Sequence, residues 1–227
     1  MIRILVLLAA ALGAVAAYAA TRERGERGEG VQVIEYYGDS TVWGYRSNSG
    51  ERVPRPAPAV FAESLPNASR FEVRNEGVNG TAACDLLNGT DGRHVPWREQ
   101  MAASKARYVI INFAINDQWK HDLDSYAGCL RSLARIARIN GKQMIFETPN
   151  PTRDSGPDGL DVYVDTMRLV AAQENVPVID QYKYLTGVLG GQKPETLCPD
   201  GLHPSEQVYI LKGRYAAKMF ASRFLEK

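Results

Sequence analysis

Hydrophobic residues in this chain gather in short apolar runs that alternate with longer, periodically spaced stretches. Five runs have the length and composition of β-strands: residues 31–37, 71–78, 107–114, 143–148 and 176–179. The third run, RYVIINFA, is the most apolar of the five. Such a run is expected for a central strand of a parallel sheet that helices cover on both faces.

Between the strands, apolar residues recur at spacings of three and four, which is the period of a helix packed on one face. Such stripes cover residues 123–137, 160–171 and 211–224, and Gly141 follows the first stripe at a position suited to ending a helix. Strands that alternate with helices predict βαβ units with right-handed crossovers. The pattern therefore predicts an α/β domain with a parallel sheet, and it contains no internal repeat.

The first 30 residues do not follow this pattern. Residues 4–17 are almost wholly apolar, and Ala17-Tyr18-Ala19 places small residues where a signal peptidase reads. The run is too short to cross a bilayer, which takes about 20 residues. We therefore expect residues 1–19 to be a signal peptide, 20–30 a flexible charged linker, and 31–227 the folded domain. An uncleaved membrane anchor is the alternative.

Composition excludes some classes of function. The 27 basic and 26 acidic residues give a formal net charge of +1, so no basic excess indicates a nucleic-acid partner. With 44% hydrophobic residues, the chain can bury a full single-domain core. We expect a secreted or periplasmic protein, monomeric, with no stable membrane span after the signal is removed.

Three cysteines occur, at Cys84, Cys129 and Cys198. Export permits a disulfide, and an odd number leaves at least one thiol unpaired. The spacings fit no zinc pattern, so we predict no metal site. We favour a Cys129–Cys198 bridge, because it would pin the loop around Cys198. Three reduced and buried thiols are the alternative.

Polar residues gather where the predicted strands end, which is where open α/β sheets bind their ligands. Acyl transfer needs a nucleophile, a base, a group that orients the base, and donors for the oxyanion. Four loops carry residues of these types: Gly38-Asp39-Ser40, Gly80, Asn116-Asp117, and Asp200-Gly201-Leu202-His203.

We predict that Ser40 is the nucleophile and His203 the base, since Asp200 stands three residues before His203 in a loop that contains a glycine. Asp200 would then orient the imidazole. The backbone N–H groups of Ser40 and Gly80 and the side-chain amide of Asn116 would form the oxyanion hole. Alternatively, Asp200 and Asn116 cap helices and Gly80 serves a turn.

In order and separation, these blocks resemble those of the SGNH/GDSL hydrolases. The resemblance implies a three-layer α/β/α sandwich with a central five-stranded parallel sheet, similar to flavodoxin. It also implies catalysis without a metal or organic cofactor. One departure is Ala114, which stands where the family usually has the glycine of Gly-x-Asn-Asp. The chain contains no Gly-x-Ser-x-Gly motif, so it does not resemble an α/β-hydrolase with a nucleophile elbow.

Residues near the nucleophile and Asn116 are candidates for substrate binding, with packing under loops as the alternative. These are Trp43, Tyr45, Arg46 and Trp119. We expect Asp39 and Asp117 to support their own loops, and His94 to be a surface or loop histidine. Three residues at the end of the fourth strand are further candidates for reaching the site: Glu147, Asn150 and Arg153.

The sequence thus predicts an exported serine esterase that acts on short acyl or acetyl esters, those of carbohydrates included. An acyltransferase with the same triad is an alternative, because both reactions share an acyl-enzyme. A non-catalytic binding module on the same fold is a second alternative.

Overall fold

The computed structural model describes residues 30–226 of the 227-residue chain. The predicted signal peptide and almost all of the predicted linker lie outside these described residues. From Gln32 onward the chain forms one compact unit. Within residues 30–226, no helix has both the length and the apolar character needed to cross a bilayer.

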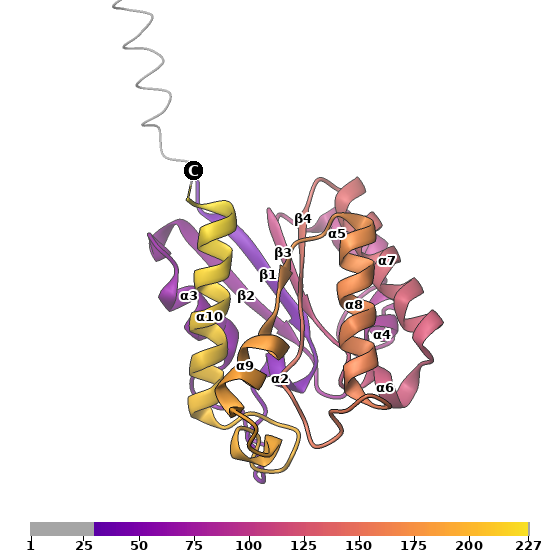
Figure 1. Cartoon of the computed structure of the whole chain (residues 1–227). Helices are drawn as coiled ribbons and strands as arrows, with labels where there is room; N and C mark the ends of the chain where they lie inside the picture. The colour runs from indigo at the N-terminus through magenta and orange to yellow at the C-terminus, as the bar shows by residue number, and fades with distance from the viewer. Residues whose placement is uncertain (1–29, 227) are drawn as a thin grey trace, which may run out of the picture. The chain divides into compact units, whose positions relative to one another are not determined.

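A parallel five-stranded sheet forms the centre of this unit, with the strand order β2-β1-β3-β4-β5 (Figure 1). This order is that of flavodoxin-like folds. The strands are β1 (Gln32–Gly38), β2 (Phe71–Gly77), β3 (Tyr108–Asn112), β4 (Gln143–Glu147) and β5 (Val178–Ile179). All five predicted strands are confirmed. The last is shorter than expected because it begins after Pro177, which has no N–H for the ladder.

Helices cover both faces of the sheet and complete the predicted three-layer sandwich (Figure 1). One face packs against α4 (Ala83–Asn88), α5 (Trp97–Ala103), α7 (Leu123–Ile139) and α8 (Leu160–Glu174). The other packs against α3 (Ala57–Ser64) and α10 (Glu206–Phe224). Shorter segments are α2 (Ser40–Trp43), α6 (Asp117–Lys120), α9 (Gln181–Leu189), η1 (Ala68–Arg70) and η2 (Pro194–Thr196).

The three helices predicted from periodicity are present as α7, α8 and α10. Helix α10 begins five residues before the predicted start, because the side chain of Ser205 accepts a hydrogen bond from Val208 N–H and caps it. The remaining short helices were not predicted, since they have too few turns to show a clear apolar stripe.

Two glycines let α2 approach the carboxyl ends of β1 and β2. A Cβ on Gly77 would lie 2.3 Å from the backbone nitrogen of Trp43, and one on Gly38 would clash with the side chain of Val42, and both of these neighbours belong to α2. The Trp43 nitrogen cannot move aside unless α2 itself shifts, because it is a backbone atom. The two glycines therefore bring the first residue of α2, Ser40, to the edge where the parallel strands end.

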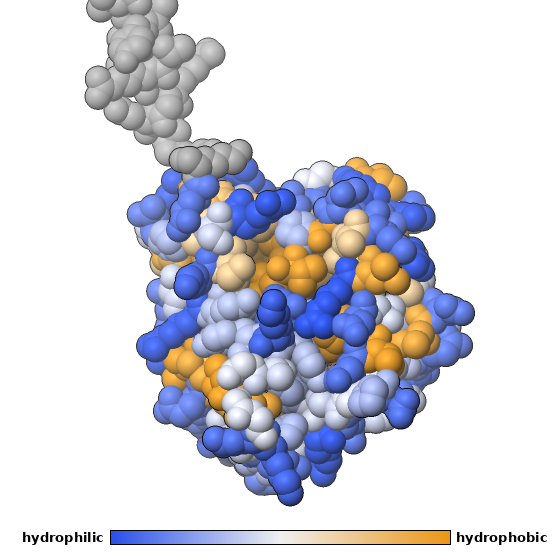
Figure 2. Space-filling view, in the orientation of Figure 1, coloured by the Kyte–Doolittle hydropathy of each residue, from blue (hydrophilic) through white to orange (hydrophobic). Residues whose placement is uncertain are grey.

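A cavity of about 290 Å³ lies elsewhere, at the start of β5. It is lined mostly by apolar residues of β4, β5 and α10, including Ile145, Val178, Met219 and Phe224. Figure 2 shows a recessed hydrophobic area between the two helical layers on this face. The cavity contains none of the predicted site residues.

Candidate active site

The turn that presents Ser40 is fixed by the buried carboxylate of Asp39. Its Oδ1 accepts hydrogen bonds from the N–H and the hydroxyl of Thr41, both at 2.8 Å, and so caps α2. Burial raises the pKa of Asp39, although the two bonds from Thr41 oppose the shift. Asp39 thus supports its own turn, as predicted.

Ser40, His203 and Asp200 lie in a continuous chain of contacts. Ser40 Oγ is 3.0 Å from His203 Nε2, and His203 Nδ1 is 2.8 Å from Asp200 Oδ2. The other carboxylate oxygen of Asp200 accepts the backbone N–H groups of Leu202 (2.9 Å) and His203 (2.7 Å). Burial raises the pKa of Asp200, but the hydrogen bonds from His203 outweigh this effect and hold the pKa below its usual value. Asp200 does not cap α10, since Ser205 does so.

Gly80 and Asn116 come from two neighbouring loops that a hydrogen bond joins. Gly80 has a φ of +74°, and a Cβ there would have no atom within 4 Å, so open space lies beside it. Asn116 Nδ2 donates to the carbonyl of Thr81 at 3.0 Å instead of capping α6. Lys120 Nζ donates to the Gly80 carbonyl at 2.7 Å, which fixes the orientation of that peptide.

The buried carboxylate of Asp117 ties the same two loops together. Its oxygens accept the backbone N–H groups of Ala83 and Ala114, each at 2.9 Å. Burial raises the pKa of Asp117 to about 7, against the effect of these two hydrogen bonds. This position agrees with the prediction that Asp117 supports its loop.

Residues 36–210 match the GDSL-like lipase/acylhydrolase family, and this match spans well over half of the chain. The chain belongs to this family. The GDSL family is one of ester-hydrolysing enzymes, so the prediction of an enzyme that acts on ester bonds is confirmed.

Solved structures share the fold of this GDSL enzyme. The acetylxylan esterase Axe2 from Geobacillus stearothermophilus is 23% identical, with a TM-score of 0.67 over 87% of this chain and 96% of its own. LAE5, an alpha/beta hydrolase enzyme from the metagenome of Lake Arreo, Spain, is also 23% identical, with a TM-score of 0.66 over 86% of this chain and 95% of its own. A search of curated protein sequences gave no match.

Tyr45 of the GDSL enzyme, a candidate for substrate binding, stacks on His203. The ring centroids are 4.3 Å apart with the planes tilted by 30°. Ser47 Oγ donates to the His203 carbonyl at 2.8 Å, and the hydroxyl of Tyr209 donates to the Tyr45 carbonyl at 2.9 Å. The segment after α2 therefore holds both the ring and the backbone of His203.

The other three substrate-binding candidates of the GDSL enzyme lie in different surroundings. The Arg52 guanidinium lies 5.7 Å from the ring centroid of half-buried Trp43. Arg46 forms an ion pair with Glu206 at 2.8 Å. The side chain of Trp119 is 55% exposed. Their contact with a substrate stays a prediction.

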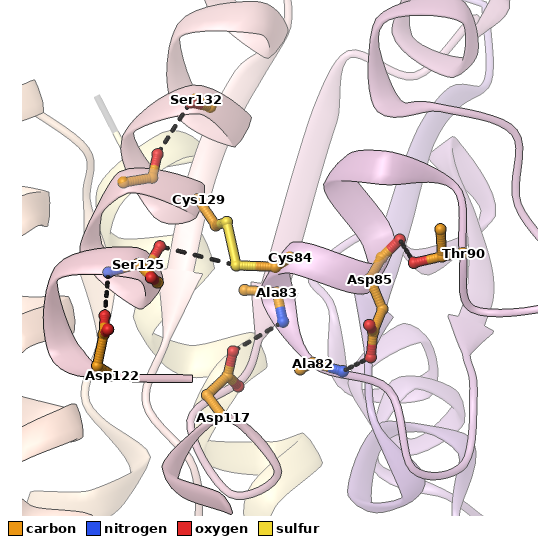
Figure 3. The surroundings of a disulfide bond; sticks show 11 residues. Ala82, Ala83, Cys84, Asp85, Thr90, Asp117, Asp122, Ser125, Cys129 and Ser132 are labelled. Carbon is orange, nitrogen blue, oxygen red and sulfur yellow. Dashed lines mark hydrogen bonds between the residues drawn. A yellow bond between two sulfur atoms is a disulfide. The ribbon is translucent and has the colours of Figure 1, made fainter. Parts of the chain in front are cut away.

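The prediction of a Cys129–Cys198 bridge is wrong. Cys84 on α4 is bonded to Cys129 on α7, and Figure 3 shows the bridge joining these two helices. Packing of α4 on α7 brings the two Cα atoms to 5.2 Å, within the usual range for a disulfide. Cys198 is free and buried.

His94 lies in a loop, as predicted, but its side chain is not on the surface. Only 7% of the side chain is exposed, and Nδ1 lies 2.6 Å from Asp91 Oδ2. Burial lowers the pKa of His94, but the neighbouring carboxylates of Glu76 and Asp91 outweigh burial and raise it. His94 is therefore part of a buried ionic cluster.

Of the three candidates at the end of β4, two contact the loop of the predicted base. Glu147 is buried and accepts hydrogen bonds from Asn112 (2.7 Å) and Gln181 (2.8 Å). The Arg153 N–H donates to the Gly201 carbonyl, and Asn150 Nδ2 donates to the Leu202 carbonyl. Within residues 30–226, no group of three or more His, Cys, Asp or Glu side chains is arranged to hold a metal ion.

Proposed function

We propose that this protein is an exported serine esterase that hydrolyses short acyl esters, including acetyl esters of carbohydrates, through an acyl-enzyme on Ser40. The observation that carries the proposal is the 3.0 Å distance between Ser40 Oγ and His203 Nε2, with Asp200 on the far side of the ring. A hydroxyl paired with an oriented imidazole is the arrangement that activates a serine nucleophile. Export is supported by the apolar N-terminal run and the small residues that follow it.

In the acylation step, His203 takes the proton of Ser40 as the hydroxyl oxygen attacks the ester carbonyl. A neutral ring with its proton on Nδ1 donates to Asp200, which leaves Nε2 free to accept. The protonated ring then gives its proton to the departing alcohol. Water enters, is activated by His203, and releases the acid from Ser40.

The oxyanion of the tetrahedral intermediate would be held by the N–H groups of Ser40 and Gly80 and by the Asn116 amide. Asn116 Nδ2 has two hydrogens, and the bond to Thr81 uses one, so the other is available to a substrate oxygen. Each such donor contributes about 3 kcal/mol to stabilisation of the transition state.

The proposed substrate class has support from structure comparison. Axe2, which has the same fold over 87% of this chain, is an acetylxylan esterase. An acetyl ester of a sugar has the small acyl group and polar alcohol that the sequence predicted. We infer the same class for this chain, with acetylated xylan as the first polymer to test.

The test compares wild type with Ser40→Ala on p-nitrophenyl esters of increasing acyl length and on acetylated xylan. We expect wild type to prefer acetate and to release acetic acid from the polymer. Ser40→Ala should lower kcat by more than about 1,000-fold, because the nucleophile is lost. Ser132→Ala is the matched control, since Ser132 Oγ bonds only within α7, to the Gly128 carbonyl. Undiminished turnover by Ser40→Ala would refute the mechanism, and a preference for long acyl chains would refute the substrate class.

A further inference from the structure

A fully buried ammonium group lies beneath the candidate active site. Lys212 on α10 is 1% exposed, and its Nζ donates to the side-chain oxygen of Asn150 at 3.1 Å. Burial lowers the pKa of Lys212, while the carboxylates of Glu147 and Asp39 act in the opposite direction. Burying such a group is unfavourable unless it is hydrogen-bonded and lies near opposite charge. Lys212 meets both conditions, and its direct partner is Asn150.

Asn150 is itself fully buried, and its amide nitrogen faces the loop that carries the predicted base. Nδ2 lies 3.1 Å from the carbonyl oxygen of Leu202 and 3.4 Å from the sulfur of Cys198. It also lies 3.2 Å from the carbonyl of Pro151. The contacts to Cys198 and Leu202 flank Asp200, and Leu202 directly precedes His203. One amide group thus contacts residues on both sides of Asp200. Residues 198–203 form the Asp200–His203 turn, and Asn150 holds this turn at two points.

Other contacts also hold this turn, and some of them come from distant parts of the chain, such as the Ser47 hydroxyl that donates to the His203 carbonyl. Gly201 N–H donates to the Cys198 carbonyl at 2.7 Å within the turn, and Arg153 N–H donates to the Gly201 carbonyl at 2.7 Å. Asn150 differs because its side chain lies between the turn and Lys212, and so connects the turn to α10 as well as to the segment after β4. Helix α10 is a rigid element of the sandwich, so Asn150 can fix where the turn lies relative to α2 and Ser40.

We propose that Asn150, held in place by the buried ammonium of Lys212, positions the Asp200–His203 turn against Ser40. Asn150 is a positioning residue, since it acts through the backbone of Leu202. The kinetic part of this inference rests on the proposed function, whereas the placement of the turn does not.

The first experiment is Asn150→Asp, which has nearly the same shape. The variant retains an oxygen for Lys212 but loses the donor to Leu202, and a carboxylate oxygen then faces that carbonyl. With p-nitrophenyl acetate we expect kcat to fall about 10- to 100-fold, because small misplacements of catalytic groups have effects of this size. KM should stay within about twofold, since no substrate contact is removed. A rise in KM with unchanged kcat would overturn the positioning role.

The second experiment does not depend on activity. Cys198 is the free thiol of the chain and is fully buried beside Asn150, so a thiol reagent reaches it only when the turn opens. We expect the rate of labelling by 5,5′-dithiobis(2-nitrobenzoic acid) under native conditions to rise about tenfold or more in Asn150→Asp. Labelling at the wild-type rate would overturn the proposal, even if activity is lost.

The matched control is Asn140→Asp. Asn140 Nδ2 also donates to a backbone carbonyl, that of Ile136, but at the end of α7 and far along the chain from the turn. This variant should lose stability while retaining the wild-type kcat and the wild-type labelling rate of Cys198. Equal acceleration of labelling in both variants would show that global unfolding, and not the turn, controls access to Cys198.

If Asn150→Asp does not fold, Lys212→Met provides the test. It removes the ammonium at similar side-chain length and leaves the Asn150 oxygen without this donor, so we expect faster Cys198 labelling and lower kcat in the same direction. Should wild type lack esterase activity, the proposed function fails, while the labelling rates still decide whether Asn150 holds the turn.

Discussion

Ala114 stands where the resemblance to SGNH/GDSL hydrolases predicts glycine, and its backbone explains that expectation. Its φ is +121°, a region that residues with a side chain rarely adopt. The conformation is held because Ala114 N–H donates to the buried carboxylate of Asp117. Strain of this kind costs about 1–3 kcal/mol. Burial of the alanine methyl group offsets about 0.8 kcal/mol of it.

We therefore expect Ala114→Gly to leave the free energy of unfolding unchanged or to raise it by up to about 1 kcal/mol, because relief of strain compensates the lost methyl contact and the greater chain entropy of glycine. Ala134→Gly, at a buried position inside α7, is the control and should lower it by about 1–2 kcal/mol. Urea unfolding measures both. An equal loss in the two variants would show that Ala114 is unstrained.

The predicted site residues were accessible from the sequence because each follows a strand or lies in a short motif. Ser40, Gly80 and Asn116 come after successive strands, and parallel strands bring their carboxyl ends to one edge. Asn150 also follows a strand and was a candidate for reaching the site, but its contact with Leu202 could not be predicted, since it joins residues 52 positions apart. Side-chain contacts of this kind depend on tertiary packing, which local patterns do not encode.

At the scale of elements, placement of α2 depends on a close approach that only glycine permits. Gly77→Ala would place a Cβ 2.3 Å from the backbone nitrogen of Trp43, so α2 must shift. We expect the free energy of unfolding to fall by about 1–3 kcal/mol, as for other overpacked sites. Because Ser40 begins α2, kcat should fall as well.

Gly128→Ala is the matched control for Gly77→Ala. Gly128 lies inside α7, and a Cβ there would meet no atom within 4 Å. Its replacement should raise the free energy of unfolding by about 0.5–1 kcal/mol through helix propensity and leave kcat unchanged. Urea unfolding measures the stability of both variants, and p-nitrophenyl acetate kinetics measures their kcat. Equal stability changes in the two variants would refute the proposed clash.

The long elements were predictable, whereas the short ones were not. Helix α7 shows a regular stripe of buried residues over 17 residues, and all five strands stood out as apolar runs. Helix α4 spans six residues and gave no stripe, so its packing on α7 was not foreseen. The cysteine pairing was wrong for the same reason, because Cys84 reaches Cys129 only through that packing.

At the scale of the whole molecule, stability should depend on pH through groups whose pKa values folding raises. Burial raises the pKa of Asp117 to about 7 from 3.8. It raises that of Asp39 too, and ionic partners raise that of His94. Between about pH 4 and pH 7 these groups therefore bind more protons in the folded state than in the unfolded state. Stability from such groups is complete below the unfolded pKa and is lost as pH rises through the folded pKa.

Asp117→Asn removes the carboxyl group whose pKa burial raises to about 7. Wild type should lose stability between pH 4.5 and 7.5, and the variant should lose less, with slopes that differ by up to about 1.4 kcal/mol per pH unit. Carboxylates with lowered pKa values, such as Asp200 and Asp180, titrate below this window and do not obscure the difference. Asp122→Asn is the control, because hydrogen bonds from Ser125 lower the pKa of Asp122. Removal of the Asp122 carboxylate should therefore leave the slope unchanged.

Urea unfolding at several pH values gives the slope of stability against pH for each variant. If Asp117→Asn keeps the wild-type slope, Asp117 is ionised throughout the window, and its hydrogen bonds to Ala83 and Ala114 then outweigh its burial.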